Sequence, residues 1–291
     1  MTPDSAHDAP APSPGGALTV GEVLAKLAAR YPLEDAEPWD RVGLLTGDPA
    51  GPATHIVCAL DPSAETLQQA FGALEADVLV THHPTYLRPE PGDVPAYGLT
   101  LESMARSNGV ALLAFHTNLD VSEPARLTMG TGLPLRSRGT LADMTDPADT
   151  SYEHPRFAQV WEPCEALTIT QVADLLAQHY QAPVRLMQAP AHEGPLTKVA
   201  TATGAGGDAL DAAIEAGVEL LITGELKYHQ LVEARDRGLS CIELGHDVSE
   251  WPLAALLHDT LVEECGDRKA TISLLPRDLF SRIVTTKGPT S

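Results

Sequence analysis

The sequence predicts an α/β protein made of two linked α/β domains with similar βαβ halves. Short apolar runs of strand length alternate with segments of helical periodicity, which is the pattern of parallel sheets covered by helices. In addition, Glu75–His83 (EADVLVTHH) aligns with Gly217–Glu225 (GVELLITGE), and the third strand of each half ends in a histidine, His116 or His246. The length of 291 residues also suits roughly two domains.

The first domain is expected to span residues 18–128, after a flexible tail at residues 1–17. Thr19 and Glu22 form a T-x-x-E capping box, which predicts a helix that begins there and ends at Pro32. A loop with a short strand follows over Pro38–Pro49. The next elements expected are the strand His55–Leu60, a helix capped by Asp61 that runs to Ala76, the strand Asp77–Thr81, a helix near Leu101–Ser107 and the strand Val110–Phe115.

The second domain is expected to span residues 129–283, with a C-terminal strand, before a frayed tail at 284–291. Its first part, Pro134–Pro155, is rich in Pro, Asp and Thr and is predicted to be a connecting loop. The elements expected after this loop are the helix Thr168–Tyr180, the strand Lys198–Thr203, the helix Asp208–Ala216, the strand Val218–Thr223, the helix Tyr228–Arg237 and the strand Ser240–Leu244.

The composition argues against several function classes. Lys and Arg number 19 against 40 Asp and Glu, so the formal charge of −21 repels phosphate backbones and anionic lipids. Aromatic residues make up 4% of the chain, too few for a platform that stacks bases. With no transmembrane run and no signal peptide, the chain is expected to be cytoplasmic and to bind neither nucleic acid nor membranes. The four cysteines form no Cys-x-x-Cys pair and are expected to be buried, reduced thiols.

Two candidate site segments directly follow apolar strands in the first domain. His82 and His83 precede Pro84, which turns the strand so that neighbouring side chains can address one site. The alternative for this pair is two solvated loop histidines. Asp120 closes the segment His116–Asp120 (HTNLD), where a carboxylate could ligate a cation or only form an Asx turn or helix cap.

A third segment follows an apolar strand in the second domain. If a helix opens near Gly245, His246 and Glu250 share a face at i and i+4, a spacing that lets one turn present two ligands to one metal. The alternative is an exposed histidine beside an acidic first turn. Ligands bind at the carboxyl ends of strands in such sheets, and imidazole with carboxylate suits zinc, iron or manganese.

A competing motif lies between a strand and a helix of the second domain. Gly204, Gly206 and Ala209 fit G-x-G-x-x-A, and Glu225 follows near the position of a ribose-binding acid. Asp208, however, places a negative charge where a pyrophosphate would bind. A tight turn with close helix packing is therefore the favoured interpretation.

Several blocks, in order, resemble the signatures of a known family. They are WDRVGLLTGDP, DVLVTHHPTYLRP, AFHTNLD, ITGELKYH and ELGHDVSEWP, and the resemblance extends from Leu18 to Ile283. The family is that of the GTP cyclohydrolase 1 type 2 homologues, the NIF-three-like dinuclear metal-centre hexameric proteins. Its members usually carry Asn where Arg41 stands here. The resemblance implies two linked α/β domains with the site between them.

The resemblance also implies a ligand set and an assembly. The ligands would be His82, His83, Asp120, His246 and Glu250, with Glu250 bridging two divalent ions of zinc, iron or manganese. It further implies a homohexameric ring. We expect a metal-dependent hydrolase acting on a nucleotide or another small phosphorylated substrate. His116 is a candidate proton shuttle and Arg88 a candidate phosphate contact. The alternative is a non-enzymatic metal-binding or regulatory interaction protein.

Overall fold

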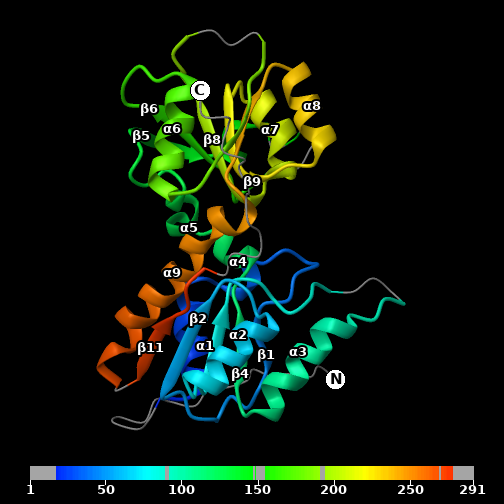
Figure 1. Ribbon diagram of the computed structural model, residues 1–291, viewed down its shortest axis with the longest axis vertical. Coiled ribbons are helices and arrows are strands. Elements are labelled where there is room, and N and C mark those ends of the chain that lie inside the picture. The colour runs from blue at the N-terminus through cyan, green and yellow to red at the C-terminus, as the bar shows by residue number, and fades with distance from the viewer. Residues whose placement is uncertain are drawn as a thin grey trace, which may run out of the picture.

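Two α/β halves are stacked along the long axis of the molecule, as the computed structural model shows (Figure 1). The structure describes residues 18–88, 92–146, 148, 155–190, 194–268 and 270–277. The predicted tails at 1–17 and 284–291 lie outside these residues. Within the described part, the strands form one five-stranded and one six-stranded sheet, which confirms the predicted fold class.

The elements alternate along the chain much as the sequence predicts. The chain begins with α1 Val20–Arg30, η1 Leu33–Asp35, β1 Gly43–Thr46, β2 His55–Ala59, α2 Ala64–Gln68, η2 Gln69–Ala73, β3 Val78–Thr81, α3 Ala96–Ser107, β4 Ala111–Ala114, α4 Thr117–Asp120 and α5 Glu123–Thr128. It continues with β5 Leu135–Thr140, η3 Ala142–Met144, β6 Gln159–Pro163, α6 Ile169–Tyr180, β7 Arg185–Met187, β8 Val199–Ala205, η4 Gly206–Ala209, α7 Leu210–Glu215, β9 Leu220–Glu225, α8 Tyr228–Asp236 and β10 Ser240–Glu243. The last elements are α9 His246–Cys265, η5 Gly266–Arg268 and β11 Thr271–Leu274.

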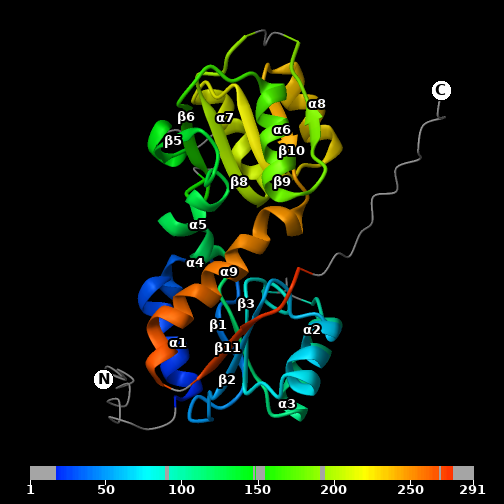
Figure 2. The ribbon, with the colours of Figure 1, turned by 60° about the vertical axis from the view of Figure 1, so that its left-hand side comes forward.

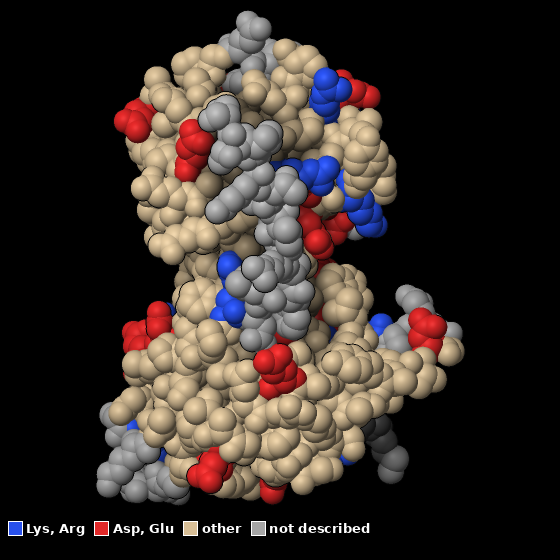
Figure 3. Space-filling view, in the orientation of Figure 1, with Lys and Arg blue, Asp and Glu red and all other residues tan. Residues whose placement is uncertain are grey.

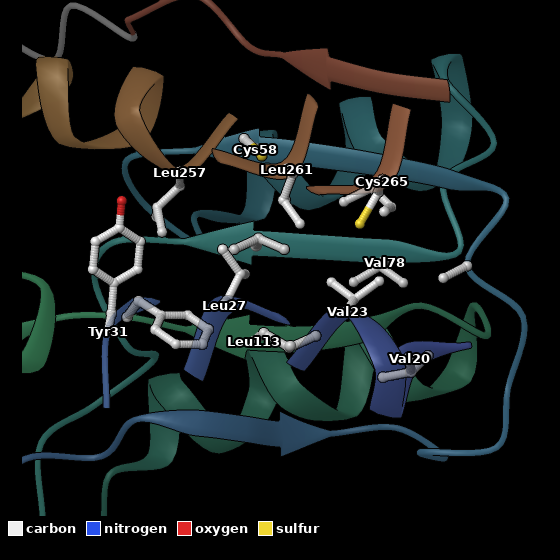
Figure 4. Packing of buried hydrophobic residues seen from close by; sticks show 14 of the residues in the cluster. Val20, Val23, Leu27, Tyr31, Cys58, Val78, Leu113, Leu257, Leu261 and Cys265 are labelled. Atoms are coloured by element: carbon white, nitrogen blue, oxygen red, sulfur yellow. The ribbon is translucent and has the colours of Figure 1, made fainter. Parts of the chain in front are cut away.

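The first sheet has the order β1-β4-β3-β2-β11, and only β1 runs antiparallel to its neighbour. Helices α1 and α9 cover one face, where Leu27 and Leu261 are fully buried with Leu113 of the sheet (Figure 4). Helices α2 and α3 cover the other face through residues such as Leu67 and Leu101. Because both faces are covered, the strands are continuous apolar runs rather than alternating ones.

The second sheet has the order β5-β6-β8-β9-β10-β7, with β8, β9 and β10 parallel at its centre. One face packs against α7 and α8 through Ala213 and Leu231, and the other packs against α6 through Leu176. In both halves, then, parallel strands end at the same edge of a helix-covered sheet. The two edges face each other across the junction that α9 crosses (Figure 2).

The C-terminal strand returns to the first half. β11 pairs in parallel with β2, matching Thr271 with His55. The predicted second domain, residues 129–283, includes this C-terminal strand, although its pairing partner lies in the first sheet. The domain boundaries themselves stay a prediction. The strand reaches β2 because α9 spans the junction, with its first turns against β8 and β9 and the rest along the first sheet.

Three local expectations are wrong. Asp61 does not cap the next helix, which begins at Ala64 with Ser63 as N-cap; the Ser63 Oγ accepts from the Thr66 amide at 3.0 Å. The expected loop Pro134–Pro155 contains β5, an edge strand that pairs antiparallel with β6, which lies beyond the end of the predicted loop. Cys164 is exposed, whereas the other three cysteines are buried.

Acidic residues outnumber basic ones, 40 to 19. On the face in Figure 3, acidic side chains lie on both halves and are interspersed with basic ones. Among the described residues, no helix has both the length and the apolar character that crossing a bilayer requires. The charge therefore forms a general negative field, which attracts cations, rather than one acidic patch on this face.

Candidate metal centre

The first two site residues extend from the end of β3. Thr81 Oγ1 donates to the carbonyl of His83 at 2.7 Å, and the His83 amide donates to the carbonyl of Leu60 at 3.0 Å. The strand is therefore already turning where the histidines occur. Their ring centroids lie 4.9 Å apart, so both rings address one site, as the following proline predicts.

His116 and Asp120 come from the neighbouring strand β4 and the single helical turn α4 that follows it. The Asp120 amide donates to the carbonyl of His116 at 3.0 Å, which places both side chains on the same turn. Buried Asn118 fixes this turn, because its Nδ2 donates to the carbonyl of Tyr31 at 2.9 Å and its Oδ1 accepts from the His116 amide. The His116 ring centroid lies 5.2 Å from that of His82.

His246 and Glu250 belong to the first turns of α9, so the predicted helix exists and the two residues share a face. The Nε2 atoms of His83 and His246 each lie 2.9 Å from Glu250 Oε2. The other carboxylate oxygen, Oε1, faces His82 Nε2 at 3.8 Å. His82 Nε2 also lies 3.6 Å from Asp120 Oδ1.

The two halves thus bring all five predicted ligands together. His116, which is not one of the five, lies beside them. Two overlapping groups of candidate ligand atoms lie within 4.8 Å of one another, His82 with His83 and His116, and His83 with His246 and Glu250. The two groups share His83. Glu250 presents Oε1 toward His82 of the first group and Oε2 toward His83. Buried histidine and glutamate side chains here could hold a metal ion.

Each of the four histidines is oriented by an acceptor on its Nδ1. Three of these acceptors are carboxylates, at 2.7 to 3.0 Å: Asp61 for His83, Asp40 for His116 and Glu225 for His246. For His82 the acceptor is the carbonyl of Phe115 at 2.9 Å. Carboxylates and carbonyls only accept, so every Nδ1 carries the proton and every neutral ring has its Nε2 lone pair free for a cation.

Sequence reasoning did not identify these carboxylates as part of the site. The sequence predicts Asp61 as a helix cap and Glu225 only as the ribose-binding acid of the competing motif. Asp40 lies 76 residues before His116, so no local spacing could link the two. One local signal is present: Asp61 comes two residues after the end of β2 and so lies at the same sheet edge as the histidine pair.

The donor set fits a divalent cation. Among the described residues, His82 Nε2, Asp120 Oδ1 and Glu250 Oε2 are buried without a hydrogen-bond partner. An unpaired buried polar atom is costly, and three in one cluster indicate that something satisfies them together. Imidazole nitrogens and carboxylate oxygens are ligands of zinc, iron and manganese.

The electrostatics of the site favour positive charge. Burial lowers the pKa of His83, but its contacts with Asp61 and Glu250 outweigh this and raise the pKa to about 10. The contact with Glu250 raises the pKa of His246 to about 9. Burial opposes ionisation of Glu250, yet the three surrounding histidines hold its pKa well below the usual range. The cluster therefore draws a proton, or a cation in its place, onto the Nε2 atoms.

Gly204, the first glycine of the competing motif, lies against this cluster. A Cβ on Gly204 would lie 2.9 Å from Glu250 Cδ and closer still to Oε1. Its amide donates to Ser249 Oγ at 2.9 Å, and its φ of +60° suits glycine. Close backbone packing beneath a site carboxylate therefore explains this glycine, as the favoured interpretation of a tight turn predicts.

Arg88 does not lie in the cluster itself. It lines an adjacent cavity of about 680 Å³ together with Asp40 and Arg41, and its side chain is exposed. The Arg88 amide donates to the carbonyl of Trp39 at 3.0 Å, which ties this segment to the loop that bears Asp40.

Comparisons with known proteins agree with this architecture. The family model described as Duf34/NIF3 (NGG1p interacting factor 3) matches residues 18–277. A GTP cyclohydrolase 1 type 2 homolog from Streptomyces coelicolor is 32% identical over 254 residues, which cover 86% of this chain and 87% of that protein. The crystal structure of the Staphylococcus aureus hypothetical protein SA1388 matches with a TM-score of 0.76 at 20% identity, over 92% of this chain and all of that one. A Bacillus cereus protein related to NIF3 matches with a TM-score of 0.74 at 18% identity, over 92% and 100%.

Proposed function

This chain belongs to the Duf34/NIF3 (NGG1p interacting factor 3) family, and on that premise we propose that it is a metal-dependent hydrolase with a dinuclear centre. The proposed ligands are His82, His83, Asp120, His246 and Glu250. The observation that carries the proposal is the position of Glu250, whose Oε2 faces His83 and His246 while its Oε1 faces His82. A carboxylate with one oxygen toward each of two donor groups suits a bridge between two ions.

When bound, two divalent ions would supply Lewis acidity and lower the pKa of a coordinated water. The residues of this chain prepare for that role. Asp61, Asp40 and Glu225 hold three imidazoles with their Nε2 atoms toward the cluster. Five ligands leave coordination positions free, which a hydrolase needs for water and substrate.

His116 is the proposed proton shuttle. Its Nδ1 donates to Asp40 Oδ1 at 3.0 Å, and Thr117 holds the other Asp40 oxygen through its amide and hydroxyl. Burial disfavours the ionised form of Asp40, yet these hydrogen bonds lower its pKa to about 2. Asp40 therefore stays ionised and stabilises a proton gained by the His116 ring, as an orienting carboxylate does for a general base. The ring also lies close enough to the cluster to serve as a further ligand.

The proposed substrate is a nucleotide or another small phosphorylated molecule. Support comes from the name of the Streptomyces coelicolor relative, a GTP cyclohydrolase 1 type 2 homolog, and from the cavity lined by Arg88 next to the centre. The competing function is that of a non-enzymatic metal-binding or regulatory protein, which would need the ligands but no turnover.

Metal analysis tests the first part of the proposal. We expect close to two ions per chain after supplementation with manganese, iron or zinc, and a large loss in Glu250→Ala. His258→Ala, on the same helix but outside the cluster, is the control and should keep wild-type metal. Absence of metal in the supplemented protein, or full metal in Glu250→Ala, would exclude the dinuclear centre.

Turnover tests the second part. Nucleotides and phosphoesters are screened with each metal, and activity is expected to disappear in His82→Ala. Bound metal without turnover of any substrate favours the non-enzymatic alternative.

A homohexamer is also proposed, on the family resemblance, and a cytoplasmic location is expected. Light scattering tests the assembly. It is done at physiological salt, where repulsion between chains of formal net charge −21 is screened over about 8 Å. A monomeric mass at all protein concentrations would contradict it.

A further inference from the structure

We propose that the cavity beside the metal centre binds the oxyanion group and apolar body of a small substrate, with Arg41 and Arg88 holding the oxyanion. This inference rests on the proposed function and adds to it a subsite for one chemical class of ligand. The cavity has a volume of about 680 Å³, within the range typical of small-molecule sites. Asp40 is part of its wall, and Asp40 Oδ1 accepts from His116 Nδ1 at 3.0 Å, so cavity and cluster are neighbours.

Contacts within the protein hold the Arg41 guanidinium in place but leave some of its N–H groups without an acceptor among the described residues. Its guanidinium lies 3.7 Å above the ring centroid of Tyr86, and its Nη1 donates to Glu102 Oε1 at 2.9 Å. Glu102 is itself buried and also accepts from Thr85 at 2.7 Å. Within the described part of the chain, Nε and Nη2 of Arg41 have no hydrogen-bond partner, although its side chain is only 21% exposed. A held, half-buried guanidinium with free N–H groups in a cavity is suited to an oxyanion.

Arg88 supplies the second positive charge, and among the residues that the structure describes no other Lys or Arg lines the cavity. Three further lining residues, Glu34, Glu37 and Asp40, are acidic. Asp40 already accepts hydrogen bonds from His116, from Thr117 and from the Arg41 amide, so its charge is used within the protein. Glu34 and Glu37 remain, on the segment before Asp40, and they favour ligand groups that donate hydrogen bonds.

The rest of the lining is apolar and suits the body of a ligand. Besides Tyr86, it includes Leu33, Val42, Leu44 and Leu99. A small molecule with an oxyanion at one end can therefore place the oxyanion on the arginines and bury its body. Phosphate and carboxylate share this chemistry, so the test includes one probe of each kind.

The test is calorimetric titration of the metal-loaded protein with phenylphosphonate, benzoate and benzamide, which share a ring and differ in charge. We expect phenylphosphonate to bind, and Arg88→Gln to raise its Kd by about tenfold or more, the factor for one charge-assisted hydrogen bond. Arg41→Met combined with Glu102→Gln is expected to do the same without leaving a buried, unpaired carboxylate. Arg136→Gln, an exposed arginine on β5, is the control and should bind like the wild type.

Metal content is measured on every variant and should stay at the wild-type level, which separates this test from that of the metal centre. Tighter binding of phenylphosphonate than benzoate assigns a phosphorylated substrate, and the reverse assigns a carboxylate. The subsite is refuted if no oxyanion probe binds, if neutral benzamide binds as tightly, or if binding is unchanged in the arginine variants and lost only in His246→Ala. A chain that binds the probes through the arginines but holds no metal would refute the centre and leave the subsite standing.

Discussion

Gly204→Ala should displace the carboxylate at the centre of the cluster. The added Cβ would lie 2.9 Å from Glu250 Cδ and closer still to Oε1, whereas two carbons pack at about 3.5 Å, so the carboxylate must move by at least about 0.6 Å. Metal–ligand distances tolerate only about 0.2 Å, so a shift of this size should weaken metal binding by at least about tenfold. Alanine at a φ of +60° also costs roughly 1 to 2 kcal/mol of backbone strain.

The matched control for this substitution is Gly217→Ala. Gly217 has a similar φ of +68°, but no neighbouring atom of the described residues lies within 4 Å of the position that its Cβ would take. Gly217→Ala therefore introduces a similar backbone strain but no clash of the new Cβ with another side chain. Thermal unfolding and calorimetric metal titration of both variants separate strain from displacement. Equal metal affinity in the two variants would refute the view that Gly204 is a glycine because Glu250 lies against it.

Three further outcomes are expected. Asp61→Ala should weaken metal binding about 10- to 100-fold by releasing His83. Ser63→Ala should instead lower the free energy of unfolding by about 1 kcal/mol without changing metal affinity. Lower stability in Asp61→Ala with unchanged metal affinity would indicate that Asp61 is the helix cap after all. Asp40 has a pKa lowered to about 2, so it stabilises the fold above the unfolded pKa of about 3.9, by roughly 2 kcal/mol, and this contribution is lost as the pH falls through 2. The difference in unfolding free energy between wild type and Asp40→Asn should therefore narrow from pH 5 to pH 2 in urea titrations, and a constant difference would contradict this origin. Iodoacetamide should modify Cys164 alone in the folded protein, because Cys58, Cys241 and Cys265 are buried and burial raises the pKa of Cys241 to about 12. Rapid modification of a second thiol, detected by mass spectrometry, would contradict this prediction.

Features encoded over a few residues could be predicted from the sequence. The capping box at Thr19 starts α1, because the Glu22 amide donates to Thr19 Oγ1 at 3.2 Å while Glu22 Oε2 accepts from the Thr19 amide. His246 and Glu250 share a helix face, because four residues make about one turn. Apolar runs marked the parallel strands, and their ends marked the sheet edges where the candidate ligands occur.

Features that join distant parts of the chain were decided only by the tertiary structure. The pairing of β11 with β2 joins distant parts of the chain, and local sequence does not predict it because strand pairing depends on backbone geometry and not on local composition. Asp61 was free to orient His83 because Ser63, two residues later, provides the cap. Gly204 is explained by a carboxylate 46 positions away. Hydrophobic periodicity determines which face of an element is buried, but it carries no information about which partner lies opposite, and at this junction the opposing partners make up the site.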